Sequence, residues 1–257
     1  MINSRFSLQD RTALVTGASS GLGWNFAKVL AKAGAAVIVT ARRKDRLDIL
    51  VKEIEADGGK ALAIPLDVTN GGSISAVFDQ SEATFGVIDL LINNAGIGDP
   101  QPFISMDETS WDTMMEVNLK SVWRISQEAS KRLIAAKKEG SIINIASILG
   151  LRVAHQLSHY ATAKAGVVQL TKALSLELAK HNIRVNALAP GYFLTEINEE
   201  FFSTEQGQNF IQRRVPMRRL GKVDELSGPL LLLASDAGSF MTGSIINVDG
   251  GHLNNSL

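Results

Sequence analysis

The sequence contains no cysteine, which excludes disulfides, thiol nucleophiles and metal sites with cysteine ligands. It has no excess of either charge, since 26 basic residues balance 26 acidic ones, so its net charge does not recruit nucleic acid or an anionic membrane. No apolar run reaches the roughly 18 residues of a membrane span, and the segment "MINSRFSLQD" has no apolar stretch behind its arginine. We therefore expect a cytoplasmic protein without a nucleic-acid or membrane partner.

Proline is scarce and scattered, with 6 in 257 residues, and no linker, low-complexity tract or repeat is visible. Short, continuously apolar runs alternate with longer helical periods, as is typical of parallel strands buried on both faces. The runs span 12–16, 36–40, 60–65, 87–93, 141–147, 183–189 and 244–249, and helices are predicted at 21–34, 44–58, 117–137, 159–180 and 222–234. The pattern predicts one α/β domain over residues 1–257, a Rossmann-like, doubly wound sheet of seven parallel strands with helices on both faces.

The longest interval without a predicted strand is the region of about 192–221. It carries the charged, amphipathic stretch "EINEEFFSTEQGQNF" and is our candidate substrate loop. A mobile lid over the carboxyl edge of the sheet and a static helical excursion are both consistent with this composition.

A glycine-rich turn, "TGASSGLGWN", follows the first predicted strand and opens a helix. It departs from the dinucleotide pattern G-x-G-x-x-G, because its glycines are Gly17, Gly21 and Gly23. The physical requirements are still met: glycine permits a tight exit from the strand and lets the backbone approach a pyrophosphate at a helix N-terminus. Ser19 and Ser20 add hydroxyl donors. The turn therefore favours nucleotide binding over a plain strand-to-helix connection.

No acidic residue occurs between Trp24 and Lys44, although NAD enzymes of this architecture place one about 20 residues after the turn, for the ribose 2′-hydroxyl. The second strand ends instead in Arg42 and Arg43, at the start of a helix whose dipole disfavours positive charge. A 2′-phosphate would balance that charge, so we predict NADP(H) in preference to NAD(H). Two solvated arginines are the alternative.

Two more loops follow predicted strands, on the side of an open α/β sheet where ligands bind. "LDVT" offers Asp67, whose carboxylate could accept the adenine amino group. "NNAG" offers Asn93 and Asn94 beside small residues against which a nucleotide can lie. Each is weak alone, because Asp and Asn are common in turns.

Tyrosine is rare, with two in the chain, and Tyr160 has Lys164 four residues later. On a helix the two side chains share one face, about 5–6 Å apart at Cβ. A free phenol has a pKa of about 10, and a nearby ammonium favours the phenolate, so we expect Lys164 to lower the pKa of Tyr160. Ser147, at the end of the run "SIINIAS", could orient a substrate oxygen. A snorkelling lysine beside a half-buried tyrosine is the alternative.

With these residues in place, the chain resembles the short-chain dehydrogenase/reductase family, and within it the 3-oxoacyl-(acyl-carrier-protein) reductase-like branch. The matching pieces are "TGASSGLG", "NNAG", Val117–Asn118, Ser147, "YATAK" and "PGYFLT", in the family's order across the chain. The resemblance implies a catalytic tetrad of Asn118, Ser147, Tyr160 and Lys164. In it Tyr160 is the acid/base, Lys164 also bonds the nicotinamide ribose, Ser147 polarises the substrate oxygen, and Asn118 holds a water that links Lys164 to solvent.

The resemblance also implies a set of dinucleotide contacts. They are Gly17, Ser19, Ser20, Gly21, Leu22, Gly23, Arg42, Arg43, Asp67, Val68, Asn94, Ala95, Gly96, Tyr160, Lys164, Pro190, Gly191, Phe193 and Thr195. A homotetramer is expected, built on the helices near 117–137 and 159–180 and on the C-terminal strand and helix. No metal is expected; His155 and His159 are not spaced as a ligand set, and His159 is interpreted as a pocket-wall residue.

The predicted function is an NADP(H)-dependent oxidoreductase that interconverts a secondary alcohol and a ketone. Reduction of a 3-oxoacyl thioester is the first choice, with sugar, polyol or other small ketones as alternatives. An acyl-carrier partner would need a basic patch, which "RRVPMRRLGK" (213–222) could supply unless it forms a salt-bridged surface. A nucleotide sensor without chemistry is a remote alternative, because all four tetrad residues are present.

Overall fold

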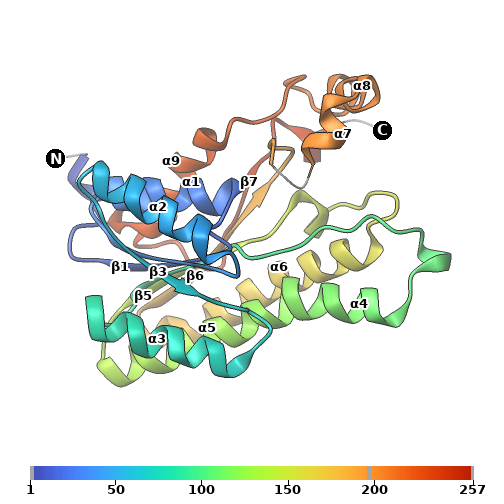
Figure 1. The fold of residues 1–257 in the computed structure, drawn as a ribbon. Coiled ribbons are helices and arrows are strands. Elements are labelled where there is room, and N and C mark those ends of the chain that lie inside the picture. The colour runs from blue at the N-terminus through green and yellow to red at the C-terminus, as the bar shows by residue number, and fades with distance from the viewer. Residues whose placement is uncertain (1–2, 196–197, 256–257) are drawn as a thin grey trace.

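The computed structural model describes residues 3–195 and 198–255. Its centre is one parallel sheet in the order β3-β2-β1-β4-β5-β6-β7 (Figure 1). The strands are β1 (Thr12–Thr16), β2 (Ala36–Ala41), β3 (Lys60–Pro65), β4 (Leu90–Asn93), β5 (Gly140–Ile145), β6 (Ile183–Pro190) and β7 (Ile245–Val248). The predicted Rossmann-like fold is confirmed, because seven parallel strands are doubly wound about the β1–β4 pair.

Helices cover both faces of the sheet, with α1, α2 and α9 in one layer and α3, α5 and α6 in the other (Figure 1). The helices are α1 (Gly21–Lys32), α2 (Lys44–Ala56), α3 (Gly71–Phe85), α4 (Glu108–Met115), α5 (Ser121–Ala136), α6 (Ser158–Leu178), α7 (Glu199–Ser203), α8 (Glu205–Arg214) and α9 (Ser227–Ala234). The inner strands are buried on both faces, which explains their continuous apolar runs. Among the described residues, no helix is both long and apolar enough to cross a membrane.

The order in which successive strands are added to the sheet reverses between β1 and β4, the parallel neighbours at its centre. At such a switch point the loops after two adjacent strands diverge and leave room for a ligand at the carboxyl edge. The loops that follow Thr16 and Asn93 start from these strands. The fold therefore places the glycine turn and the "NNAG" segment side by side.

Two helices between β3 and β5, α3 and the short α4, were missed by the sequence prediction. Helix α3 begins with two glycines and is rich in serine and threonine, all poor helix formers. It is stabilised instead by its N-cap, Asn70, whose side chain accepts a hydrogen bond from the backbone of Ser73, and by burial of Ile74, Val77 and Phe78. Helix α4 is similarly capped by Asp107, which accepts from the backbone of Ser110.

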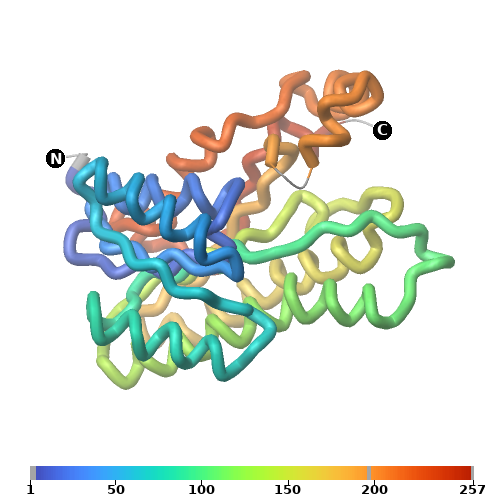
Figure 2. Tube along the Cα trace, viewed as in Figure 1, coloured from blue at the N-terminus to red at the C-terminus, as the bar shows by residue number. Residues whose placement is uncertain are grey.

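The candidate substrate loop is helical where the structure describes it, since α7 and α8 both fall within it. Residues 196 and 197, part of that region, lie outside the described residues. Figure 2 shows this orange stretch beyond β6, above the yellow-green loop that follows β5. Of the two predicted alternatives, the helical excursion describes the conformation of this substrate-loop region. Closure of the region over the sheet stays a prediction.

Candidate functional site

The glycine turn is packed too tightly for any side chain. Gly17 has a φ of +67°, and a Cβ there would lie 2.8 Å from the Cα of Ala95. A Cβ on Gly23 would collide with the carbonyl oxygen of Gly17. Gly21, at φ +56°, faces Thr195, whose Cγ2 would be 3.5 Å from an added Cβ. Three segments distant in sequence therefore meet at this turn, as a site for an extended ligand requires.

The N-terminus of α1 is open to an anion. Ser20 is the N-cap residue in an extended conformation, yet its side chain makes no capping hydrogen bond. The amides of the first turn thus lack a side-chain acceptor, and a pyrophosphate supplies oxygens of the kind they need. The side chain of Leu22 points away from this open helix end and packs against the core.

A basic corner lies beside this turn. Arg43 donates from Nε and Nη2 to the hydroxyl of Ser19, at 3.2 and 3.1 Å, and from Nη2 to the hydroxyl of Ser20 at 2.8 Å. Arg42 is exposed next to it. The hydroxyls of the glycine turn and the guanidinium group of Arg43, one of the two arginines predicted for a 2′-phosphate, are thus brought together, and these residues fit the phosphate groups of a dinucleotide.

Two of the predicted contact residues have their side chains engaged in holding loops. Asn94 donates from Nδ2 to the carbonyl oxygens of Thr16 (2.9 Å) and Gly17 (3.2 Å), so its amide fixes the glycine turn. Asp67 accepts hydrogen bonds from the backbone and hydroxyl of Thr69, which lower the pKa of its carboxyl group. Val68 is half-buried and packs on the core. Contact of these residues with a nucleotide stays a prediction.

Ser147 and Tyr160 meet at the carboxyl edge of β5. Ser147 follows the strand, is buried, and accepts a hydrogen bond from the backbone of Leu149 at 3.1 Å. Tyr160 lies in the first turns of α6, and its hydroxyl is hydrogen-bonded to Ser147. A ketone oxygen placed beside both hydroxyls would be oriented and within reach of one acidic proton.

Lys164 lies near Tyr160 and is held by the sheet. Its ammonium donates to the carbonyl oxygen of Ile145 at 2.8 Å and lies 5.7 Å from the centre of the Tyr160 ring. Burial lowers the pKa of Lys164 from 10.5 to about 8. Burial also raises the pKa of Tyr160, and the hydrogen bond from Ser147 only partly opposes this. In the protein alone, desolvation thus outweighs the Ser147 hydrogen bond at the phenol, and lowering of the Tyr160 pKa by Lys164 stays a prediction.

Asn118 lies in a π-helical turn, η3 (Glu116–Lys120), between α4 and α5. Its Oδ1 accepts from the backbone of Ile97 and its Nδ2 donates to the carbonyl of the same residue, both at 2.9 Å. Gly96 separates it from the lysine, since a Cβ there would lie 2.7 Å from Asn118 Oδ1 and 3.8 Å from Lys164 Nζ. Asn118 is thus a fully bonded buried amide next to Lys164; its role in a water relay stays a prediction.

The segment after β6 closes the site on its far side. Pro190 ends the strand, and Gly191 packs so closely on Asp249 that a Cβ would lie 2.7 Å from that residue's Cα. Phe193 is buried in the core and pairs with Gly221 in an isolated bridge, so only its backbone is available to a ligand. Thr195 is fixed by a backbone hydrogen bond to Asn198.

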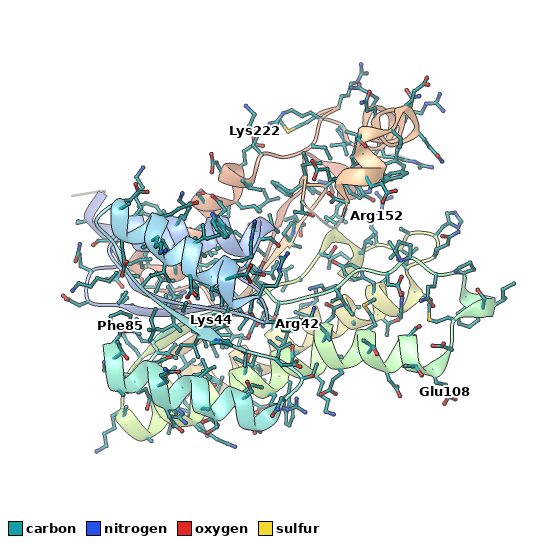
Figure 3. All side chains as sticks on the ribbon, in the orientation of Figure 1. Arg42, Lys44, Phe85, Glu108, Arg152 and Lys222 are labelled. Atoms are coloured by element: carbon teal, nitrogen blue, oxygen red, sulfur yellow. The ribbon has the colours of Figure 1, made fainter. Side chains whose placement is uncertain are left out.

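Three residues at the site's mouth were given no role in the sequence analysis. Tyr192 packs with Tyr160 in one apolar cluster. Arg152, five residues after Ser147, donates to the backbone carbonyl of His252 at 2.7 Å and lies between the loop after β5 and α7 (Figure 3). The signal for Tyr192 was its rarity, but no local pattern predicted the approach of the C-terminal turn, η8 (His252–Asn254).

The histidines do not form a ligand set. His159 is fully buried, with both ring nitrogens unpaired among the described residues, and His155 is exposed. Within the described part of the chain, no group of three or more His, Asp or Glu side chains could hold a metal ion. His159 thus lies in the interior of the α6 packing, and a role as pocket wall stays a prediction.

Comparisons with known proteins agree with this geometry. Residues 17–252 match the family model described as "Enoyl-(Acyl carrier protein) reductase". The chain is 39% identical over 244 residues to a 3-oxoacyl-(acyl-carrier-protein) reductase of Thermotoga maritima, covering 95% of this chain and 98% of the relative. It is 35% identical over 252 residues to the 5-keto-D-gluconate 5-reductase of Escherichia coli, covering 98% and 99%.

A solved structure of an enzyme with a comparable sequence identity is also similar to this chain. The gluconate 5-dehydrogenase of Burkholderia cenocepacia, crystallised with NADP and tartrate, superposes with a TM-score of 0.95 at 35% identity, covering the whole of both chains.

Proposed function

The chain belongs to the short-chain dehydrogenase/reductase family, and from this premise we propose that it reduces a hydroxylated keto acid with NADPH, or oxidises the corresponding alcohol with NADP⁺. That it is an oxidoreductase acting on CH–OH groups follows from the family. The dinucleotide preference and the substrate class are the new parts of the proposal.

Tyr160 supplies the proton for the reduction. Its raised pKa keeps the phenol protonated at neutral pH, so in the resting protein it is ready to act as an acid toward a ketone oxygen. Ser147 orients that oxygen through its hydroxyl, and Lys164 provides a nearby cation as negative charge develops. When bound, the nicotinamide donates or accepts the hydride. For the oxidation Tyr160 must first lose its proton.

The preference for NADP(H) is supported by the corner of Arg42, Arg43, Ser19 and Ser20. Arg43 is already held by two hydroxyl groups, so a phosphate there would meet a guanidinium whose position is largely fixed. Asp67, the carboxylate near Arg42, is bonded to Thr69.

The observation that carries the substrate class is the guanidinium of Arg152. It is half-buried beside the catalytic loop, it donates a hydrogen bond to the backbone carbonyl of His252, and no carboxylate in the described ranges pairs with it. A half-buried cation of this kind favours an anionic partner. A substrate carboxylate would supply that partner, which agrees with the gluconate enzymes among the relatives.

Reduction of a 3-oxoacyl thioester is the second candidate. It is favoured by the exposed Arg213, Arg214 and Arg218 in α8 and the loop after it, which could meet an acidic carrier protein. Arg219 is already paired with Glu225, so that part of the stretch is a salt-bridged surface.

A homotetramer remains part of the proposal, supported by the exposed Trp123 and Leu176 on α5 and α6.

The test is a comparison of turnover with matched concentrations of NADPH and NADH. We expect reduction of 5-keto-D-gluconate with NADPH to exceed reduction with NADH, and to exceed reduction of acetoacetyl-CoA. Rapid turnover of acetoacetyl-CoA without turnover of the sugar acid would move the assignment to the acyl thioester. Equal or better rates with NADH would contradict the dinucleotide preference.

A further inference from the structure

Both tyrosines of the chain lie in one site, although only Tyr160 belongs to the proton-transfer group. Tyr192 directly follows Gly191 and lies on the opposite wall. Its ring is held edge-on by the rings of Phe202, Phe210 and His252, at centroid distances of 5.5, 5.4 and 5.3 Å. Contacts on three sides leave the phenol little freedom to rotate away.

The hydroxyl of Tyr192 has no hydrogen-bond partner within residues 3–195 and 198–255, although the side chain is half-buried. Leu253 and Ala154 pack in the same cluster, so the surroundings of the ring are largely hydrocarbon. The groups that act on this phenol electrostatically are Tyr160 and the exposed Arg214, while burial raises its pKa. An unpaired phenol thus borders the reacting centre.

We propose that the Tyr192 hydroxyl hydrogen-bonds a hydroxyl group of the substrate beside the ketone, and so selects hydroxylated ketones over ketones with bare alkyl chains. The inference rests on the proposed function and adds to it a residue that reads the substrate's hydroxyl pattern. Tyr192 is a specificity residue, since Tyr160 and Ser147 remain the groups at the ketone oxygen.

The selection follows from where the hydroxyl lies. A substrate that covers the Tyr192 ring displaces water from its hydroxyl, and a substrate hydroxyl restores the lost bond. A substrate with a methylene at that position leaves the phenol unpaired, so it binds less well although it fits the space. The apolar rings around Tyr192 offer few alternative partners.

The experiment compares Tyr192→Phe with the wild type on two acids of the same chain length, 5-keto-D-gluconate and 5-oxohexanoate, which carries the same ketone and carboxylate without hydroxyls. We expect kcat/KM for 5-keto-D-gluconate to fall about 3- to 15-fold, the usual worth of one neutral hydrogen bond. The value for 5-oxohexanoate should stay within about twofold, since no bond to Tyr192 is lost. The Kd for NADPH should not change.

A matched control variant keeps the Tyr192 hydroxyl and weakens the aromatic contacts that hold the Tyr192 ring. Phe210→Leu loosens the same aromatic contacts, so it should lower kcat/KM for both acids alike. A Tyr192→Phe variant that discriminates between the acids as well as the wild type would overturn the inference while leaving the proposed function intact. If the wild type turned over neither acid, the proposed function itself would fail, and the inference with it.

Discussion

Replacing the buried Lys164 by methionine should raise the free energy of unfolding at neutral pH while removing most of the turnover. The side chain is 4% exposed and its ammonium donates a hydrogen bond to the carbonyl oxygen of Ile145. Methionine has a similar length and no charge, so it fills the same space without burying a cation.

The magnitude follows from the pKa of Lys164. A fall from 10.5 to about 8 on folding means that burying the charged form costs about 3 kcal/mol. The Ile145 carbonyl loses its lysine donor in the variant, which costs about 1–2 kcal/mol. The variant should therefore be about 1–2 kcal/mol more stable than the wild type at pH 7.

The pH dependence tests the cause. Because the folded-state pKa lies below the unfolded one, the cost is fully present below pH 8 and is relieved as pH rises toward 10.5. The advantage of Lys164→Met should thus shrink above pH 8 and reverse by about pH 10. Urea unfolding of both proteins at pH 7 and pH 10, at one protein concentration and without dinucleotide, measures the difference. A variant less stable than the wild type at pH 7, or a difference independent of pH, would refute the reasoning.

Other substitutions test the remaining parts of the site and the assembly. Arg43→Ala should raise the KM for NADPH about 10- to 100-fold and leave that for NADH nearly unchanged, since only a 2′-phosphate loses its charge-assisted bonds; equal effects would place Arg43 elsewhere. Gly23→Ala should cost about 2–4 kcal/mol of stability and abolish NADPH binding, because its Cβ meets the Gly17 carbonyl; calorimetry and fluorescence titration measure both. Leu176→Arg should dissociate the proposed tetramer, as measured by light scattering, and an unchanged mass would remove α6 from the proposed interface.

Most of the sheet could be predicted because its strands are buried on both faces. A run such as Thr12–Thr16 is buried throughout and apolar between its two threonines, a composition that burial on both faces favours. Helix α3 could not be predicted in the same way, since its first residues are two glycines. Its stability comes from the Asn70 cap and from contacts with α5, which only the assembled fold provides.

The candidate site likewise has features that the local sequence encodes and features that only tertiary contacts create. The i, i+4 spacing of Tyr160 and Lys164 and the glycines of the turn are local features, so the sequence revealed them. The direction of the Lys164 side chain depends on the packing of α6 against β5, which brings the carbonyl oxygen of Ile145 to the lysine ammonium. The position of Tyr192 depends on α7, α8 and the C-terminal turn meeting around one ring. Both are tertiary contacts that no short motif encodes.

The most direct test of the account is turnover by Tyr160→Phe, measured beside its affinity for NADPH. Loss of the phenol removes the proton donor and leaves the glycine turn and the basic corner unchanged. We predict a fall in kcat of about 10²–10⁴-fold, with the Kd for NADPH within about threefold of the wild-type value. A variant that kept a tenth or more of the wild-type kcat would contradict the assignment of Tyr160 as the acid.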